Sequence, residues 1–143
     1  MDADAMRGPA AIQSVVTFVV ASDVLSVDQI TLAVGCPPDF SLEKGTIRAG
    51  SKVPIPARQT TWEIREDASG MVDIGEALAR LAGRLRLMLE PLRQLRSCGC
   101  TSKLGIVQCI TPVASLGFVI ELENLQLFAE LGAFLDVDQY LEP

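Results

Sequence analysis

The sequence predicts an α+β domain: a mainly antiparallel sheet of about five or six strands, with one long and two short helices packed mostly on one face. Two observations lead to this prediction. Between Val72 and Ser97, apolar residues recur at alternating spacings of four and three, which places one apolar stripe along a helix. On either side of this segment lie runs rich in β-branched and aromatic residues, which favour strands. Because the stripe must be buried against an apolar surface, we expect the helix to cover the sheet.

The N-terminal part of the chain is typical of a strand followed by a short helix. Residues Ser14–Ala21 are largely apolar at both alternating sets of positions, which indicates an interior strand. The sequence Ser26-Val-Asp-Gln29 has the capping-box pattern, in which both polar side chains satisfy free amides of the first helical turn. We therefore expect a helix after Ser26 that ends at Gly35, because glycine readily adopts the left-handed conformation of a helix end.

A long loop is predicted next. The segment between Pro37 and Gln59 contains four prolines, which leaves room for only a short edge strand at Thr46–Ala49. The following residues, Thr60–Glu66, alternate between polar and apolar side chains. We expect a strand there with Trp62 on its buried face.

The long helix should be interrupted, because Pro91 lacks an N–H and its ring crowds the preceding turn. We expect the helix to end at Gly99. Two strands, Leu104–Thr111 and Leu116–Leu122, are then predicted as a hairpin joined across Pro112–Ser115.

A helix and a strand are predicted to close the chain. Asn124 can cap the helix and Gly132 can end it. Residues 135–140 alternate between apolar and polar side chains, as a strand does. The predicted order βαββ-α-ββαβ suggests a derivation from the ferredoxin-like arrangement.

Length and composition favour one cytoplasmic domain. The chain has 143 residues, 49% of them apolar, and we expect a loose tail at residues 1–12 before a single domain at residues 13–143. The longest apolar stretches are too short to cross a membrane. Four cysteines are too few and too irregularly spaced for the disulfide framework of a small secreted domain, so we expect reduced thiols.

The charge distribution argues against nucleic acid as a partner and predicts a local attraction. The net charge is −6, whereas binding to phosphate backbones needs clustered basic residues. Residues 71–103 nevertheless carry six basic and three acidic groups, and residues 121–143 carry six acidic groups and no basic one. These two segments should attract each other, within a chain or between chains.

Several motifs in this order resemble a known family. They are the strand and capped helix from Ser14 to Gly35, the pair Lys44-Gly45, the strand with Trp62, the leucine-rich helix and the closing segment Leu135–Tyr140. Together they resemble the bacterial DUF4279 family, a domain of unknown function, over nearly the whole chain. The sequence departs from the family's pattern in the proline-rich residues 53–57 and in Gly-Phe-Val-Ile at 117–120. The resemblance implies the architecture and a bacterial source, but no catalytic residue.

The absence of histidine from the chain makes an enzyme the less favoured interpretation. Histidine is the commonest general base near neutral pH and a frequent metal ligand. The chain also has no glycine-rich phosphate loop and no nucleophile elbow. We expect no cofactor.

Cysteines and aspartates are the remaining candidates for chemistry. The pair Cys98-Gly99-Cys100, with Cys36 and Cys109, has thiols for zinc or a redox pair, but a second Cys-x-x-Cys knuckle is missing. Asp136 and Asp138 share one side of a strand and suit acid–base chemistry or a cation. The competing interpretation is that they are solvated carboxylates that discourage edge pairing.

The first functional hypothesis is a small non-catalytic interaction protein, with self-association as a homodimer among its forms. It would act through an exposed sheet edge or through arginines of the long helix, for which Arg80, Arg84 and Arg93 are the candidates. By analogy it would serve as a toxin-neutralising or regulatory partner. The competing interpretation of the arginines is a solvated helix face.

The alternative hypothesis is a small-ligand-binding protein, or an unusual carboxylate-dependent enzyme, that uses a concave sheet surface and the loop beside it. Lys44, Arg58 and Trp62 are the candidate ligand-binding residues, since a cation over the indole ring is attracted to it. The competing interpretation is that Trp62 fills the core.

Overall fold

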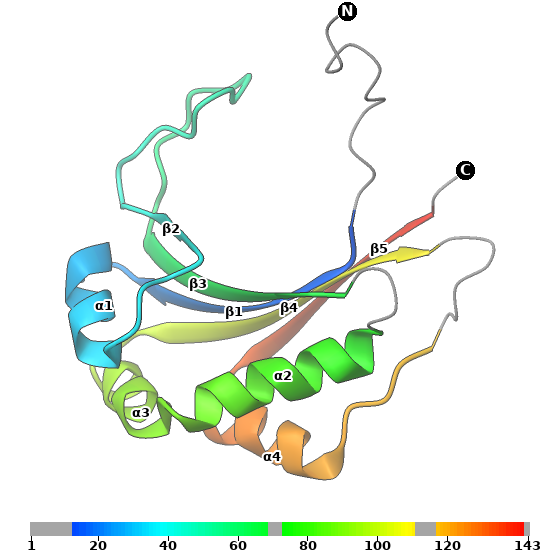
Figure 1. Ribbon diagram of the computed structural model, residues 1–143. Coiled ribbons are helices and arrows are strands. Elements are labelled where there is room, and N and C mark those ends of the chain that lie inside the picture. Colours follow the sequence, from blue (N-terminus) through cyan, green and yellow to red (C-terminus); the bar gives the residue numbers. More distant parts are fainter. Residues whose placement is uncertain (1–12, 69–72, 111–116, 142–143) are drawn as a thin grey trace, which may run out of the picture.

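The computed structural model describes residues 13–68, 73–110 and 117–141 and folds them into one sheet with a layer of helices (Figure 1). The helices lie on one side of the sheet, and its other face carries no helix in the described part of the chain. The elements in chain order are β1 (Val15–Ser22), α1 (Val27–Val34), β2 (Phe40–Leu42), β3 (Thr60–Asp67), α2 (Ile74–Arg86), α3 (Leu89–Ser97), β4 (Thr101–Ile110), α4 (Leu122–Glu130) and β5 (Phe134–Leu141).

The five strands have the order β2-β3-β1-β4-β5. All neighbours are antiparallel except β4 and β5, which are parallel. The prediction of an α+β domain with helices on a sheet is confirmed, but its details are corrected. The described residues form a five-stranded mixed sheet and four helices. The first four strands have the connection order of a split βαβ arrangement, to which β5 is added beside β4.

β1 lies at the centre of the sheet, as its pattern predicts. It pairs with β3 on one side and with β4 on the other. The side chains of Val16, Phe18 and Val20 face the helices and are completely buried. Its β-branched residues suit this position, because they pack well on a pleated surface.

The predicted apolar stripe forms the helix side of the core. Leu78, Leu85 and Leu92 are all buried. The helix is divided as predicted, into α2 and α3, and the break lies at Leu87 and Met88. In an uninterrupted helix the residue at position 91 would donate its N–H to the Leu87 carbonyl, but Pro91 has no N–H and its ring would clash with that carbonyl. In the first turn of α3 no such bond is needed, so Pro91 is accommodated there.

The helix ends follow their predicted signals. Ser26 Oγ accepts from the Gln29 amide at 3.1 Å, and Gln29 Oε1 accepts from the Ser26 amide at 2.9 Å. Gly35, Gly99 and Gly132 follow α1, α3 and α4 with positive φ angles of 78°, 92° and 67°. The capping box and the glycine stops are therefore confirmed.

The predicted hairpin of Leu104–Thr111 and Leu116–Leu122 is wrong. The structure has one strand, β4, and then residues 117–121 without regular structure, followed by α4. Phe118 and Ile120 pack against the core, but none of the described strands pairs with this segment, so alternation alone makes no strand. The cap of α4 is Glu121 rather than Asn124. The proposed turn at Pro112–Ser115 lies outside the described residues.

The connection through α4 explains the parallel β5. A chain that leaves β4 and crosses over through a helix returns in the same direction, whereas a hairpin would have reversed it. α4 packs beside α2, and β5 then pairs with β4 in register, with Leu104 beside Leu135 and Ile106 beside Val137.

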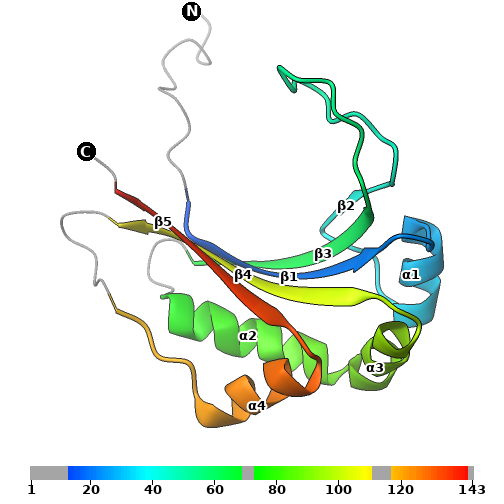
Figure 2. The same cartoon turned by 180° about the vertical axis from the view of Figure 1, so that it is seen from behind.

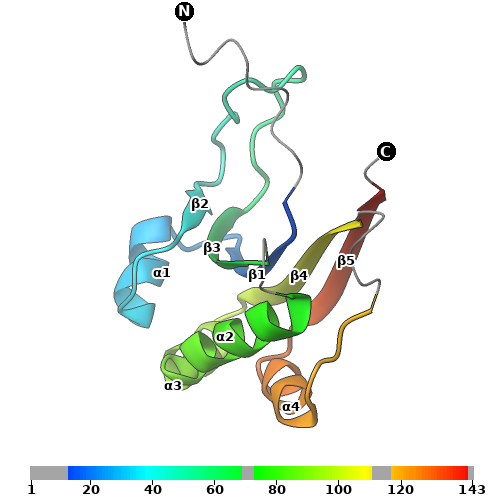
Figure 3. The same ribbon diagram turned by 45° about the vertical axis from the view of Figure 1, so that its right-hand side comes forward.

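The connection between β2 and β3 is an arm, residues 43–59, which projects from the sheet on the side away from the helix layer (Figures 1 and 3). Its two legs are held together where the Gly45 amide donates to Ala57 O at 2.8 Å and the Ala57 amide donates to Thr46 O at 2.9 Å. The expected edge strand at Thr46–Ala49 is reduced to a single bridge between Ile47 and Pro56. β2 itself was not predicted.

The structure bears differently on the predictions of an N-terminal tail and of no membrane-spanning segment. Residues 1–12, the expected tail, lie outside the described residues. Across 13–68, 73–110 and 117–141, no helix has the length and apolarity needed to cross a bilayer.

Candidate interaction surface

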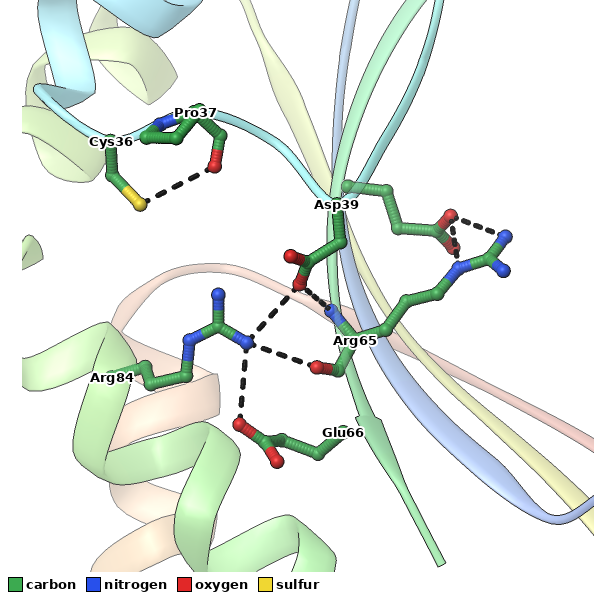
Figure 4. A network of polar contacts seen from close by, with 7 residues as sticks. Cys36, Pro37, Asp39, Arg65, Glu66 and Arg84 are labelled. Atoms are coloured by element: carbon green, nitrogen blue, oxygen red, sulfur yellow. Dashed lines mark hydrogen bonds and ion pairs between the residues drawn. The ribbon is translucent and has the colours of Figure 1, made fainter.

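Arg84, a predicted partner-binding residue, is held by its own chain. Its Nη1 donates to Arg65 O at 2.9 Å, to Asp39 Oδ2 at 3.2 Å and to Glu66 Oε1 at 3.3 Å (Figure 4). Asp39 Oδ2 also accepts from the Arg65 amide at 2.8 Å. The guanidinium therefore ties α2 to β3 and to the segment that leads into β2.

The charge of Arg84 is secure in this place. Partial burial lowers the pKa of its guanidinium, but the hydrogen bonds and charges of Asp39 and Glu66 raise it more, so that the pKa lies above its ordinary value. A partner that used Arg84 would have to displace both carboxylates. The position is better suited to holding the fold together.

The other two predicted arginines also contact acidic groups nearby. Arg80 pairs with Glu76 one helical turn away at 3.0 Å, with both side chains about half exposed. Arg93 pairs with Glu90 at 3.5 Å and with Glu130 at the end of α4. Use of either arginine by a partner remains a prediction.

A shallow pocket lies between α3 and the end of α4. It has a volume of about 440 Å³ and is lined by Arg93, Arg96, Ser97 and Glu130. Arg96 Nη1 donates to Glu130 O at 3.1 Å, and its guanidinium lies directly against the backbone of Gly132. Both arginines of this pocket thus connect α3 to the end of α4.

The predicted attraction between residues 71–103 and 121–143 is confirmed within the chain. Besides the pair of Arg93 with Glu130, Lys103 Nζ lies 3.8 Å from Asp136 Oδ2. Arg86 Nη2 donates to Asn124 Oδ1 at 2.8 Å, a hydrogen bond from a charged donor to an uncharged side chain that joins the same two segments. These contacts join α2, α3 and β4 to the C-terminal α4 and β5.

The three predicted ligand-binding residues lie in different surroundings. Lys44 Nζ donates to Asp23 O at 3.0 Å, and Arg58 is exposed on the arm. Trp62 is completely buried in the core, which leaves no solvent-facing ring on which a ligand could stack. Its Nε1 has no hydrogen-bond acceptor among the residues that the structure describes.

Cys100 is poorly suited to chemistry near neutral pH. All four are free, with Cys98 exposed and Cys100 buried. Burial raises the pKa of the Cys100 thiol, a hydrogen bond with Ser22 lowers it, and the nearby Cys98 raises it further, with a net rise. The thiol therefore stays protonated, which disfavours it as a nucleophile or metal ligand. Within the described ranges, no three Cys, Asp or Glu side chains are placed to hold a metal ion.

β5 has the most unusual exposure in the sheet. All eight of its residues are exposed, although it is fully paired with β4 along one side. Leu135 and Val137 share the register of the buried Leu104 and Ile106, yet they are 56% and 40% exposed. The helix layer therefore covers β4 and leaves β5 uncovered at the edge of the sheet (Figure 2).

The other face of β5 is apolar at its ends and acidic in the middle. By strand alternation, Asp136 and Asp138 lie on the helix-free face, between the exposed rings of Phe134 and Tyr140. This agrees with the prediction that both carboxylates share one side of a strand. Among the described residues, Asp138 has no ion-pair partner.

The arm is exposed and apolar like β5 but carries the opposite charge. Residues 43–59 contain four basic residues and one acidic residue, a net charge of +3. In the part of the chain that the structure describes, eight of the fourteen exposed large apolar side chains lie on these two elements. The arm carries Ile47, Val53 and Ile55, and β5 carries Phe134, Leu135, Val137, Tyr140 and Leu141.

Comparison with known proteins identifies the family to which the chain belongs. The model of the family described as "Domain of unknown function (DUF4279)" matches residues 11–142, nearly the whole chain. The chain belongs to the DUF4279 family. The resemblance noted in the sequence is thereby confirmed. Neither the curated proteins nor the solved structures contain a significant match to this DUF4279 chain.

The sequence pointed to charged residues on both elements of this DUF4279 protein, Lys44 and Arg58 on the arm and Asp136 and Asp138 on β5, but not to their exposed apolar side chains. Alternation in residues 135–140 predicts a strand, but it cannot tell whether a helix will cover that strand. The basic residues of the arm were visible as a local charge excess in a proline-rich loop.

Proposed function

We propose that this DUF4279 protein is a non-catalytic interaction module that binds its partner by adding an extended segment to the outer edge of β5. The observation that carries this proposal is the exposure of β5, which presents five large apolar side chains and a second edge to which no described strand pairs. Natural proteins usually shorten, charge or cover such edges, and β5 is neither short nor covered, while its two carboxylates, Asp136 and Asp138, restrict which segments can pair with it. Exposed apolar surface at an uncovered edge favours a binding role.

Strand addition would use both the backbone and the side chains of β5. The outer N–H and C=O groups would form a ladder with the incoming segment, and the side chains would select it. On the helix side, Leu135 and Val137 favour apolar residues. On the other face, Asp136 and Asp138 favour lysine or arginine directly opposite. The preferred partner is therefore an extended segment that alternates apolar and basic residues.

The contacts of the arginines support β5 over the long helix as the binding surface. Arg84 and Arg93 each contact two carboxylates of their own chain, whereas no charged group of the described residues pairs with Asp138. A regulatory or toxin-neutralising protein would act in this way, by engaging its target through β5.

The test uses a synthetic octapeptide of alternating valine and lysine, with alternating valine and glutamate as the matched control. In amide NMR spectra of the full chain, we expect the lysine peptide to shift resonances of β5 and the adjoining part of β4, and the glutamate peptide to shift none. The double variant Leu135→Lys, Val137→Lys should lose this response and keep its unfolding midpoint, since both side chains are exposed in the folded chain.

Arg80→Glu serves as the control variant, and it should bind the lysine peptide as the wild type does. Shifts confined to α2 and α3, or an unchanged response in the β5 double variant, would overturn the proposal.

A further inference from the structure

We propose that the segment added to β5 is the arm of a second copy of this chain, so that the protein associates with itself through opposite edges of its sheet. This inference rests on the proposed function, because it names the occupant of the β5 edge.

Charge is the first argument for the arm. The arm has a net charge of +3, whereas residues 121–141, which comprise α4 and β5, carry five acidic groups and no basic one. Opposite charges of this size favour encounter and orient the two surfaces. A centred antiparallel pair of two β5 strands would instead place Asp136 and Asp138 of the two copies against each other, which is unfavourable.

The residue pattern of one leg of the arm matches that of β5. Pro54 and Pro56 lack N–H groups, which makes their leg a poor partner for a ladder, so the leg Thr46–Ala49 is the one suited to pairing. In an extended segment Ile47 points to one side and Arg48 to the other. On β5, Val137 and Asp138 also point to opposite sides. One register can therefore place Ile47 beside Val137 and Arg48 beside Asp138.

Ile47 and Arg48 are both accessible at the surface. Ile47 is 52% exposed, and Arg48 is exposed with its guanidinium 5.6 Å from the centre of the Phe40 ring. That distance is near the outer limit of a cation–π contact, so Arg48 can leave the ring at small cost. Arg65 lies closer to the same ring, at 5.0 Å, and would remain there.

The topology makes the contact intermolecular. The arm leaves from β2 and β3 at one edge, and β5 is the other edge, with β1 and β4 between them. Strands lie about 4.8 Å apart, so β2 and β5 of one copy are separated by roughly 19 Å. If two copies exchange arms, each supplies one arm and one β5, and the twofold arrangement closes as a dimer.

The experiment measures the self-association of the full chain by analytical ultracentrifugation over a concentration series. We expect a reversible dimer whose dissociation constant rises with salt. Arg48→Asp and Asp138→Arg should each raise that constant at least about tenfold, because each sets like charges against each other. The two substitutions together in one chain should restore association, since the exchanged charges attract again. Arg80→Asp, on the helix side, is the control and should have no effect.

The outcomes separate this inference from the proposed function. A chain that stays monomeric at every concentration, or a dimer indifferent to both single reversals, overturns the exchange of arms. If the valine–lysine peptide still binds β5 in that case, the proposed function stands and only the occupant is wrong. If the peptide also fails, both are wrong. The variants change exposed residues, and equal urea midpoints would show that they fold.

Discussion

β1 and β5 are both eight-residue strands with apolar side chains at alternating positions, yet one lies at the centre of the sheet and the other at its edge. Val16, Phe18 and Val20 of β1 are completely buried under the helices. The corresponding side of β5 is 40% or more exposed at Leu135 and Val137. The comparison teaches that the place of a strand in the sheet decides whether its apolar side chains stabilise the fold or remain available for binding.

The energetic difference between the two strands is large. Complete burial of a large apolar side chain contributes about 1.5–3 kcal/mol, roughly in proportion to the area removed from water. The large apolar side chains of β5 are 40–81% exposed, so a partner that covers them would add a substantial part of this contribution. Three experiments test this division between a stabilising centre and a binding edge.

The largest effect is expected for a pair of phenylalanines. Phe18→Ala should lower the free energy of unfolding by about 3–5 kcal/mol, because it leaves a cavity in the buried layer between sheet and helices. Phe134→Ala should change it by less than about 1 kcal/mol, since that ring is 58% exposed. Urea unfolding measures both, and equal losses would remove the distinction between centre and edge.

An intermediate effect is expected where α2 is tied to the β3 side of the sheet. Arg84→Met should cost about 1–2 kcal/mol, since Asp39 and Glu66 lose a charged hydrogen-bond partner in a partly exposed site. Arg80→Met removes only an exposed pair within one helix and should cost less than about 0.5 kcal/mol. Similar urea midpoints for the two variants would show that Arg84 is merely a surface charge.

The smallest effect is expected at the ion pair between β4 and β5. Lys103 and Asp136 lie 3.8 Å apart with side chains 36% and 49% exposed, so Asp136→Asn should change the free energy of unfolding by at most about 0.5 kcal/mol. Thermal unfolding at low and high salt measures it. A loss above 1 kcal/mol would mean that this pair, rather than the backbone ladder, holds β5 in place.

Local signals in the sequence were sufficient for most elements. The capping box at Ser26 and the glycine at 35 bound α1 without help from the rest of the chain. The stripe in α2 and α3 and its division by Pro91 also depend on neighbours within one or two turns. β1 follows from a run that is apolar at both alternating sets of positions, and β3 follows from the alternation of polar and apolar residues.

The errors arose where long-range contacts decide. Residues 117–121 alternate like a strand, but no strand in the described part of the chain pairs with them, and the chain instead reaches α4 and returns parallel to β4. From the sequence alone, Arg84 cannot be distinguished from the other arginines of its helix. Its partner Asp39 lies 45 positions away and is brought to it only by the fold. The exposure of β5 depends on where the helix layer stops, which no local pattern contains.

Trp62 has a practical consequence, because it is the only tryptophan of the chain and it is completely buried. An indole in dry, apolar surroundings emits at shorter wavelength than one in water, so the native protein carries an optical reporter of its own interior. Intrinsic fluorescence can follow denaturation of every variant without a label. Because neither the arm nor β5 contains a tryptophan, assembly should leave that emission unchanged, and the two events can be watched separately in one sample.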